Sequence, residues 1–156
     1  FMNIITSLDN NYKCNIFYNE KVNNTVIDNS HFIRINYSNE LFTLTGLFLK
    51  INMNINDIEK YFNKFKYSYN LSPNKDIIDK LIKFEEDLLN IKELNNLNKT
   101  FKLKEQLLSM NIRTFDNINP IEKTNIYSFL LKISGIWLTN TQCGLTFKFL
   151  PCESVR

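Results

Sequence analysis

Apolar and polar residues alternate most regularly over 126–150, in the sequence IYSFLLKISGIWLTNTQCGLTFKFL. A polar stretch at 139–142 separates two runs with a two-residue period, and Gly144 follows it. The pattern predicts a long β-hairpin whose loop ends at Gly144, because glycine adopts left-handed turn conformations at little cost. One face of the first predicted strand collects large apolar side chains: Tyr127, Phe129, Leu131, Ile133 and Trp137.

A second alternating run covers 64–71. Lys64 and Lys66 share one face of this run, and Tyr67 and Tyr69 share the other. The alternation predicts a strand with one side against the core and one side toward solvent.

The N-terminal third also has strand character. Segments 12–18 and 22–27 are short β-branched or aromatic runs bounded by Asn. Segments 31–38 and 41–51 are longer, and the polar residues between them favour a turn, so the two segments predict a hairpin. Gly46 interrupts the second segment and predicts a bulge or a close backbone approach, as in a strongly coiled strand.

Helical periodicity is clearest over 72–91. Ser72 is a candidate N-cap, and Pro73 suits the first helical position. A second helix is predicted at about 100–110, and a short helix or turn at 56–62. Apolar residues of the first helix recur at three- and four-residue steps: Ile77, Leu81, Phe84 and Leu88.

The order of these elements indicates the fold class. Strands come first, then a helix, a helical or irregular connection, and a final hairpin, which indicates a β-rich α+β domain and not a doubly wound sheet. An OB-fold-like small barrel with an inserted amphipathic helix and a C-terminal β-hairpin fits this order. The length of 156 residues suits a single domain over 1–156.

The amino-acid composition reduces the value of the lysines as evidence for nucleic-acid binding. The chain has 25 Asn, 19 Ile and 16 Lys, and no Ala. Codons for the first three are rich in A and T, so an AT-rich genome, such as that of a large DNA virus, explains the bias. Lysine abundance is therefore weak support for nucleic-acid binding, and the net charge of +3 is modest.

Cysteine usage and apolar run lengths bear on location. Cys14, Cys143 and Cys152 form neither a CxxC motif nor an even disulfide framework, which favours a reducing setting. No apolar run approaches the roughly 20 residues that span a bilayer, and the start of the chain has no signal-peptide pattern. We expect an intracellular protein, in host cytoplasm or nucleus if viral, not secreted and without a membrane partner.

Catalytic motifs are absent from the sequence. His31 is the only histidine, so zinc sites and His-based nucleophilic sites are disfavoured. No glycine-rich phosphate loop occurs. Glu85, Glu86 and Asp87 fit the solvated side of a helix, although a metal-dependent nuclease remains a third, weaker alternative. We expect no enzyme, no metal and no cofactor.

Aromatic residues interleaved with lysines are the remaining chemical signal. Single-stranded nucleic acid is bound by rings that stack on bases and by cations that follow the phosphates. The same alternation occurs on any half-buried strand, so core packing stays an open alternative for each ring. The candidate contacts are Lys64, Lys66, Tyr67, Tyr69, Lys132, Trp137 and Lys148.

Two segments carry a family resemblance. The hairpin YSFLLKISGIWLTNTQCGLTFKFL, with Trp137, the polar loop and Gly144, resembles the closing hairpin of viral OB-fold single-stranded-DNA-binding proteins. The family includes those of T7-like phages and of large eukaryotic DNA viruses. The segment YNLSPNKDIIDKLIKFEEDLL resembles the strand–helix element of that family. Phage members end in an acidic tail, whereas this chain ends FLPCESVR.

The resemblance implies sequence-independent binding of single-stranded DNA in replication or recombination. RNA, a second copy of the chain and replication proteins are further candidate partners. The alternative is a viral structural or protein-interaction module without nucleic-acid binding. Scattering of Lys64, Lys66, Lys132 and Lys148 over different faces would favour this alternative.

Overall fold

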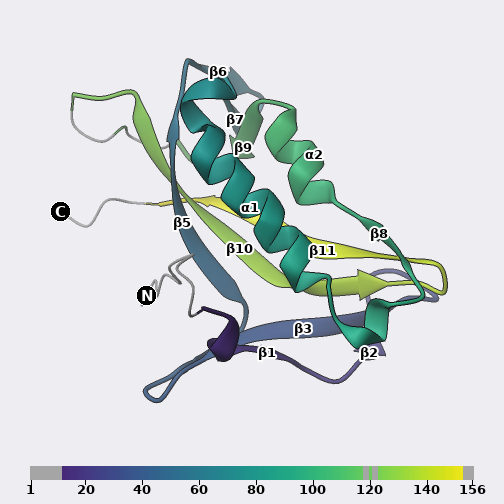
Figure 1. Cartoon of the computed structure of the whole chain (residues 1–156). Helices are drawn as coiled ribbons and strands as arrows, with labels where there is room; N and C mark the ends of the chain where they lie inside the picture. Colours follow the sequence, from purple (N-terminus) through teal and green to yellow (C-terminus); the bar gives the residue numbers. More distant parts are fainter. Residues whose placement is uncertain (1–11, 118–119, 121–122, 153–156) are drawn as a thin grey trace.

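The computed structural model describes residues 12–117, 120 and 123–152, arranged as a large curved sheet, a small sheet and helices (Figure 1). Eight strands form the main sheet: β1 (Ile16–Tyr18), β2 (Val22–Asn23), β3 (His31–Ser38), β4 (Thr43–Leu44), β5 (Leu47–Asn54), β8 (Asn98–Thr100), β10 (Ile126–Leu138) and β11 (Gln142–Pro151). Three strands form the small sheet: β6 (Asp57–Tyr61), β7 (Lys64–Ser68) and β9 (Asn111–Thr114).

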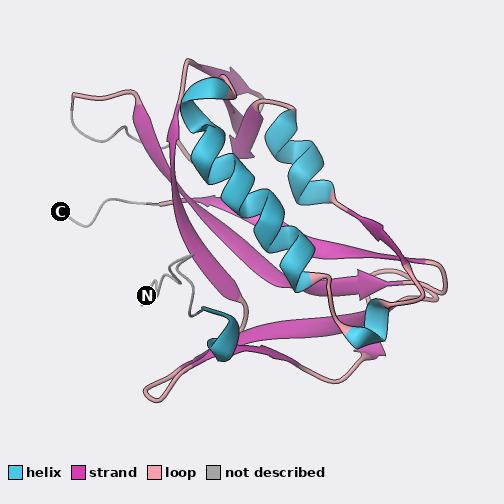
Figure 2. Cartoon of the chain, in the orientation of Figure 1, coloured by secondary structure: helices cyan, strands magenta, loops and turns pink. Residues whose placement is uncertain are grey.

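Two α-helices, α1 (Lys75–Leu88) and α2 (Lys102–Leu108), lie over one face of the main sheet (Figures 1 and 2). We call this the inner face and the opposite side the outer face. Short 3-10 turns are η1 (Tyr12–Asn15), η2 (Ser72–Asn74) and η3 (Lys92–Leu94). Buried residues of both sheets and both helices form one hydrophobic cluster.

Strand β10 is the centre of the main sheet. It pairs antiparallel with β11 over most of its length, which confirms the predicted C-terminal hairpin. Its other edge is shared: 135–138 pair with β3, and 126–133 pair with β5. A single long strand therefore fixes three others in register.

A β-bulge changes the facing of side chains within β10. The register with β11 shifts between Ile133 and Gly135, and an extra residue of this kind moves the following side chains to the other face. Beyond the shift, Ile136 and Leu138 are buried and continue the inner face. The prediction that Trp137 shares a face with Ile133 is therefore wrong, because a strict two-residue period takes no account of the bulge.

The predicted hairpin of 31–38 with 41–51 forms only in part. The chain returns along β3 only in the two-residue strand β4, and β5 then turns away to pair with β10. The change of direction occurs at Gly46, whose φ of 110° is rarely adopted by residues with a side chain. The close backbone approach predicted at Gly46 is confirmed, since an added Cβ would lie 3.2 Å from the carbonyl oxygen of Ile133.

Helix α1 confirms the helix predicted over 72–91, within narrower bounds. Its apolar stripe is buried, including Ile78, Leu81 and Phe84. The predicted cap is wrong: Ser72 belongs to a 3-10 turn, and the residue that precedes the helix is Asn74.

The buried Asn74 side chain ties the start of α1 to the end of β5. Its Oδ1 accepts a bond from the Asn54 N–H at 2.7 Å, and its Nδ2 donates to the carbonyls of Asn54 at 3.0 Å and Asn70 at 2.9 Å. Asn74→Ala should lower the free energy of unfolding by about 2 kcal/mol, because buried backbone groups lose their partner. Urea unfolding measures this loss, with the exposed Asn90→Ala as control. Equal losses in both variants would contradict the role.

The small sheet corrects the prediction for 56–62. This segment forms strand β6, which pairs with β7 through a tight turn where Phe62 has a φ of 55°. β9 pairs with the other edge of β7. Most of β6 is exposed, so it lacks the apolar alternation that marks a half-buried strand.

The main sheet is open. Its path runs from β1 through β3, β10 and β11 to β8, and β1 does not pair with β8 in the described part of the chain. The predicted β-rich α+β class with a helix and a C-terminal hairpin is confirmed, whereas the sheet does not close into a barrel. Within 12–117 and 123–152, no helix is long and apolar enough to cross a membrane.

Candidate nucleic-acid interface

The single tryptophan of the chain, Trp137, lies on the outer face of the main sheet. Its cross-strand neighbours are Phe32 on β3 and Gly144 on β11. A Cβ atom at Gly144 would lie 2.9 Å from Cζ2 of Trp137, so the indole lies across this glycine. Gly144 therefore provides the space that the ring occupies, and the ring remains partly exposed.

Phe32 lies across a second glycine on the same face. A Cβ at Gly135 would lie 2.6 Å from Cζ of Phe32 and 2.3 Å from the carbonyl oxygen of Ile33. The Arg34 guanidinium is 5.9 Å from the centre of the Phe32 ring, a cation–π distance. An aromatic ring that covers a neighbouring glycine is a known way to stabilise glycine in a sheet.

The third ring of the outer face is Phe48 on β5. It is the cross-strand partner of Lys132, whose Nζ lies 5.6 Å from the ring centre. Lys50, two residues further along β5, is exposed on the same side. An aromatic ring thus lies beside a cation twice on the outer face: Phe32 beside Arg34, and Phe48 beside Lys132.

Lys132 and Lys148 face each other directly across β10 and β11. Like charges in this position repel, which costs a fraction of a kcal/mol, roughly 0.2–1. None of the eight described strands of the main sheet contains Asp or Glu. A bound anion would relieve this repulsion.

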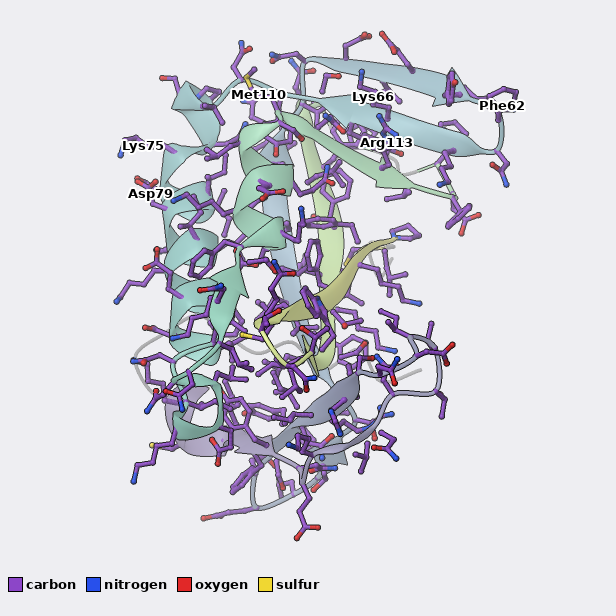
Figure 3. All side chains as sticks on the ribbon, turned by 90° about the vertical axis from the view of Figure 1, so that its right-hand side faces the viewer. Phe62, Lys66, Lys75, Asp79, Met110 and Arg113 are labelled. Carbon is purple, nitrogen blue, oxygen red and sulfur yellow. The ribbon has the colours of Figure 1, made fainter. Side chains whose placement is uncertain are left out.

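The lysine candidates fall on two surfaces. Lys132 and Lys148 lie with Trp137 on the outer face. Lys64 and Lys66 lie on the small sheet, where Lys66 is paired with Arg113 (Figure 3). The four lysines thus lie on two different surfaces, which favours the protein-interaction alternative, although the two members of each pair lie together.

Tyr67 and Tyr69 are core residues, which corrects their prediction as base-stacking residues. Their exposed fractions are 0% and 2%. The Tyr67 ring packs edge-on against Phe129 at 5.1 Å between centroids. The Tyr69 hydroxyl donates to the carbonyl of Leu107 at 2.8 Å, and burial raises the pKa of Tyr69. Neither ring has a face to offer to a base.

Sequence reasoning missed four residues of the outer face: Phe32, Arg34, Phe48 and Lys50. The alternation carried the signal: every second residue of 47–54 is a buried apolar residue, and Ile33 and Ile35 are buried within 31–38. What the sequence alone lacked was the pairing of both segments to β10, which places their solvent sides next to Trp137 and Lys132.

Glu85 is fully buried, which corrects its assignment to a solvated helix face. Its carboxylate accepts bonds from the backbone N–H groups of Leu103 and Lys104, both at 2.9 Å, at the start of α2. This role is structural. Among the described residues, no group of three or more His, Cys, Asp or Glu side chains is placed to hold a metal ion.

Comparisons with known proteins add no relative. No protein-family model, no curated protein and no solved structure matches the chain.

Proposed function

We propose that the outer face of the main sheet binds single-stranded nucleic acid, with single-stranded DNA as the expected ligand, independently of sequence. The observation that supports the proposal most is a row of cations beside partly exposed rings on strands without a single acidic residue. Stacking on rings together with phosphate contacts is the usual chemistry of such binding.

Each side chain has a defined task in this proposal. The rings of Phe32 and Trp137 offer one side to a base, since the other side lies on a glycine. Lys132 and Lys148 hold a phosphate between them, which replaces their mutual repulsion with two attractive contacts.

Other parts of the proposal depend on the family resemblance. We include in the proposal a role in replication or recombination of an AT-rich viral genome. We also include kinship with OB-fold proteins. The open strand-rich sheet, the covering helix and the long final hairpin are compatible with that kinship. A non-enzymatic role follows from the absence of a catalytic motif in the sequence.

Titration of the intrinsic fluorescence with oligo-dT tests the proposal, because the single tryptophan lies within the site. Stacking on a base should quench Trp137. Affinity should fall with rising salt, with a log–log slope of about −0.7 for each phosphate contact. Absence of any binding at low salt would refute the proposal, and the protein-interaction alternative would then stand.

The double variant Lys132→Ala/Lys148→Ala should reduce the magnitude of the salt slope by about 0.7, because the two lysines together contact one phosphate. Lys80→Ala/Lys92→Ala removes the same charge from exposed positions on α1 and η3 and serves as the matched control. The control should leave the slope unchanged. An equal effect of both variants would mean that net charge, not the outer face, governs binding.

A further inference from the structure

The small sheet carries a second group of rings and cations on the side turned away from the core. Cross-strand pairing places Tyr61 beside Lys64, and the Lys64 Nζ lies 5.2 Å from the ring centre of Phe115. The next row aligns Lys66 with Glu59 on one side and Arg113 on the other. A hollow of about 560 Å³ lies here, lined by Glu59, Tyr61, Phe62, Asn63, Lys64, Lys66 and Arg113.

The rings of this surface are unusually exposed. Tyr61 and Phe115 are each 65% exposed and Phe62 is 83% exposed. Figure 3 shows Phe62 at the tip of the projecting β6–β7 hairpin, with Lys66 and Arg113 further along the same sheet. Large apolar side chains exposed together indicate a binding surface more often than scattered single ones do.

The two surfaces are joined along the chain but open on opposite sides. Tyr67, which alternates with Lys66 on β7, packs on Phe129 of the inner face, so the hollow turns away from the main sheet. Strand β5 carries Lys50 on the outer face and ends at Asn54, and β6 begins at Asp57. The step from Lys50 to Asn54 is about 13 Å at the rise of a β-strand. The Ile55 N–H donates to the Asn125 carbonyl at 2.9 Å, so the start of β10 is held at this junction too.

We infer that the hollow side of the small sheet is a second contact area for the same nucleic-acid strand. This inference rests on the proposed function. A strand that fills the outer face, continues past Lys50 and bends around the junction of β5 and β6 would stack on Tyr61 or Phe115 and place phosphates on Lys64, Lys66 and Arg113. The ligand is therefore a single strand long enough to reach both areas.

Bipartite binding makes affinity depend on ligand length. A strand held on the outer face presents its free end to the small sheet at high effective concentration, so a second weak contact strengthens binding substantially. Among the described residues that line the hollow, Glu59 alone is acidic, and it moderates the attraction for phosphates.

A tryptophan placed on the hairpin reports contact directly. We would combine Tyr61→Trp with Trp137→Phe, so that the introduced indole is the only one in the chain. An oligo-dT of about 5 nucleotides, near the lower site size of small binding folds, should leave this indole unquenched, and one of about 20 should quench it. No quenching by the long strand, or equal quenching by both, would overturn the inference.

Affinity ratios provide the second readout. In the wild type, the long strand should bind at least about tenfold tighter than the short one. Lys64→Ala/Lys66→Ala should reduce this ratio while leaving short-strand affinity and Trp137 quenching unchanged. An unchanged ratio would overturn the second contact area alone. If no strand of any length quenched Trp137 in the wild type, the proposed function itself would fail.

Discussion

Replacement of Glu85 by Gln is expected to lower the free energy of unfolding by about 3 kcal/mol, since one of two buried backbone donors loses its acceptor. The first N–H groups of a helix have no partner within it, and Phe101, which precedes α2, provides no side-chain cap. Glu85 on α1 supplies both acceptors at 2.9 Å. A Gln side chain keeps one acceptor and turns an NH₂ group toward the other donor.

The same carboxyl group should make stability depend on pH. Burial raises the pKa of Glu85 above its ordinary value, against the opposing effect of the two backbone donors. The folded state then binds the proton more tightly than the unfolded chain, so the stabilisation is lost as pH rises through the raised pKa. The difference in unfolding free energy between wild type and Glu85→Gln should therefore widen as pH is lowered toward about 4.3.

Urea unfolding of both proteins at several pH values measures this difference, because other carboxylates titrate alike in both and cancel. Glu86→Gln is the matched control, since Glu86 is the exposed neighbour on the same helix. It should change stability by less than about 0.5 kcal/mol. A loss at Glu86 as large as that at Glu85 would show that helix charge, not the cap on α2, matters.

The sequence predicted the elements whose residues are placed by local periodicity. The amphipathic stripe of α1 and the alternation of the final hairpin are repeated many times along their segments, so both elements were found. Strand β6 was missed because it is mostly exposed and has no apolar period. The partner of β5 was missed because pairing with β10 joins residues more than 70 positions apart, which leaves no local trace.

The candidate site was predicted less well, because each residue type alone was ambiguous. A tyrosine on an alternating strand fits the core and a binding face equally, and Tyr67 and Tyr69 proved to be core residues. Trp137 was placed on the wrong face because one extra residue before Gly135 reverses the alternation. The glycine that each ring covers lies on another strand, Gly135 for Phe32 and Gly144 for Trp137, so local sequence did not mark either pair.

Gly135→Ala is expected to destabilise the protein by about 3 kcal/mol or more, at the upper end of the cost of overpacking. The added Cβ would lie 2.3 Å from the carbonyl oxygen of Ile33, and backbone cannot move aside as a flexible side chain can. Whether Gly135→Ala destabilises or stabilises the protein distinguishes a crowded glycine from an ordinary strand position. At an ordinary strand position, alanine is more stable than glycine by about 0.5–1 kcal/mol.

A double-mutant cycle with Phe32→Leu separates the two contacts. The Cβ would also lie 2.6 Å from Cζ of Phe32, so loss of the ring should recover part of the cost and leave the backbone clash. Thr146→Ala, at the exposed position opposite Gly135, is the control and should be nearly neutral. If Gly135→Ala stabilised the protein, the ring would not lie on this glycine, and the outer face would lose one of its flat stacking surfaces.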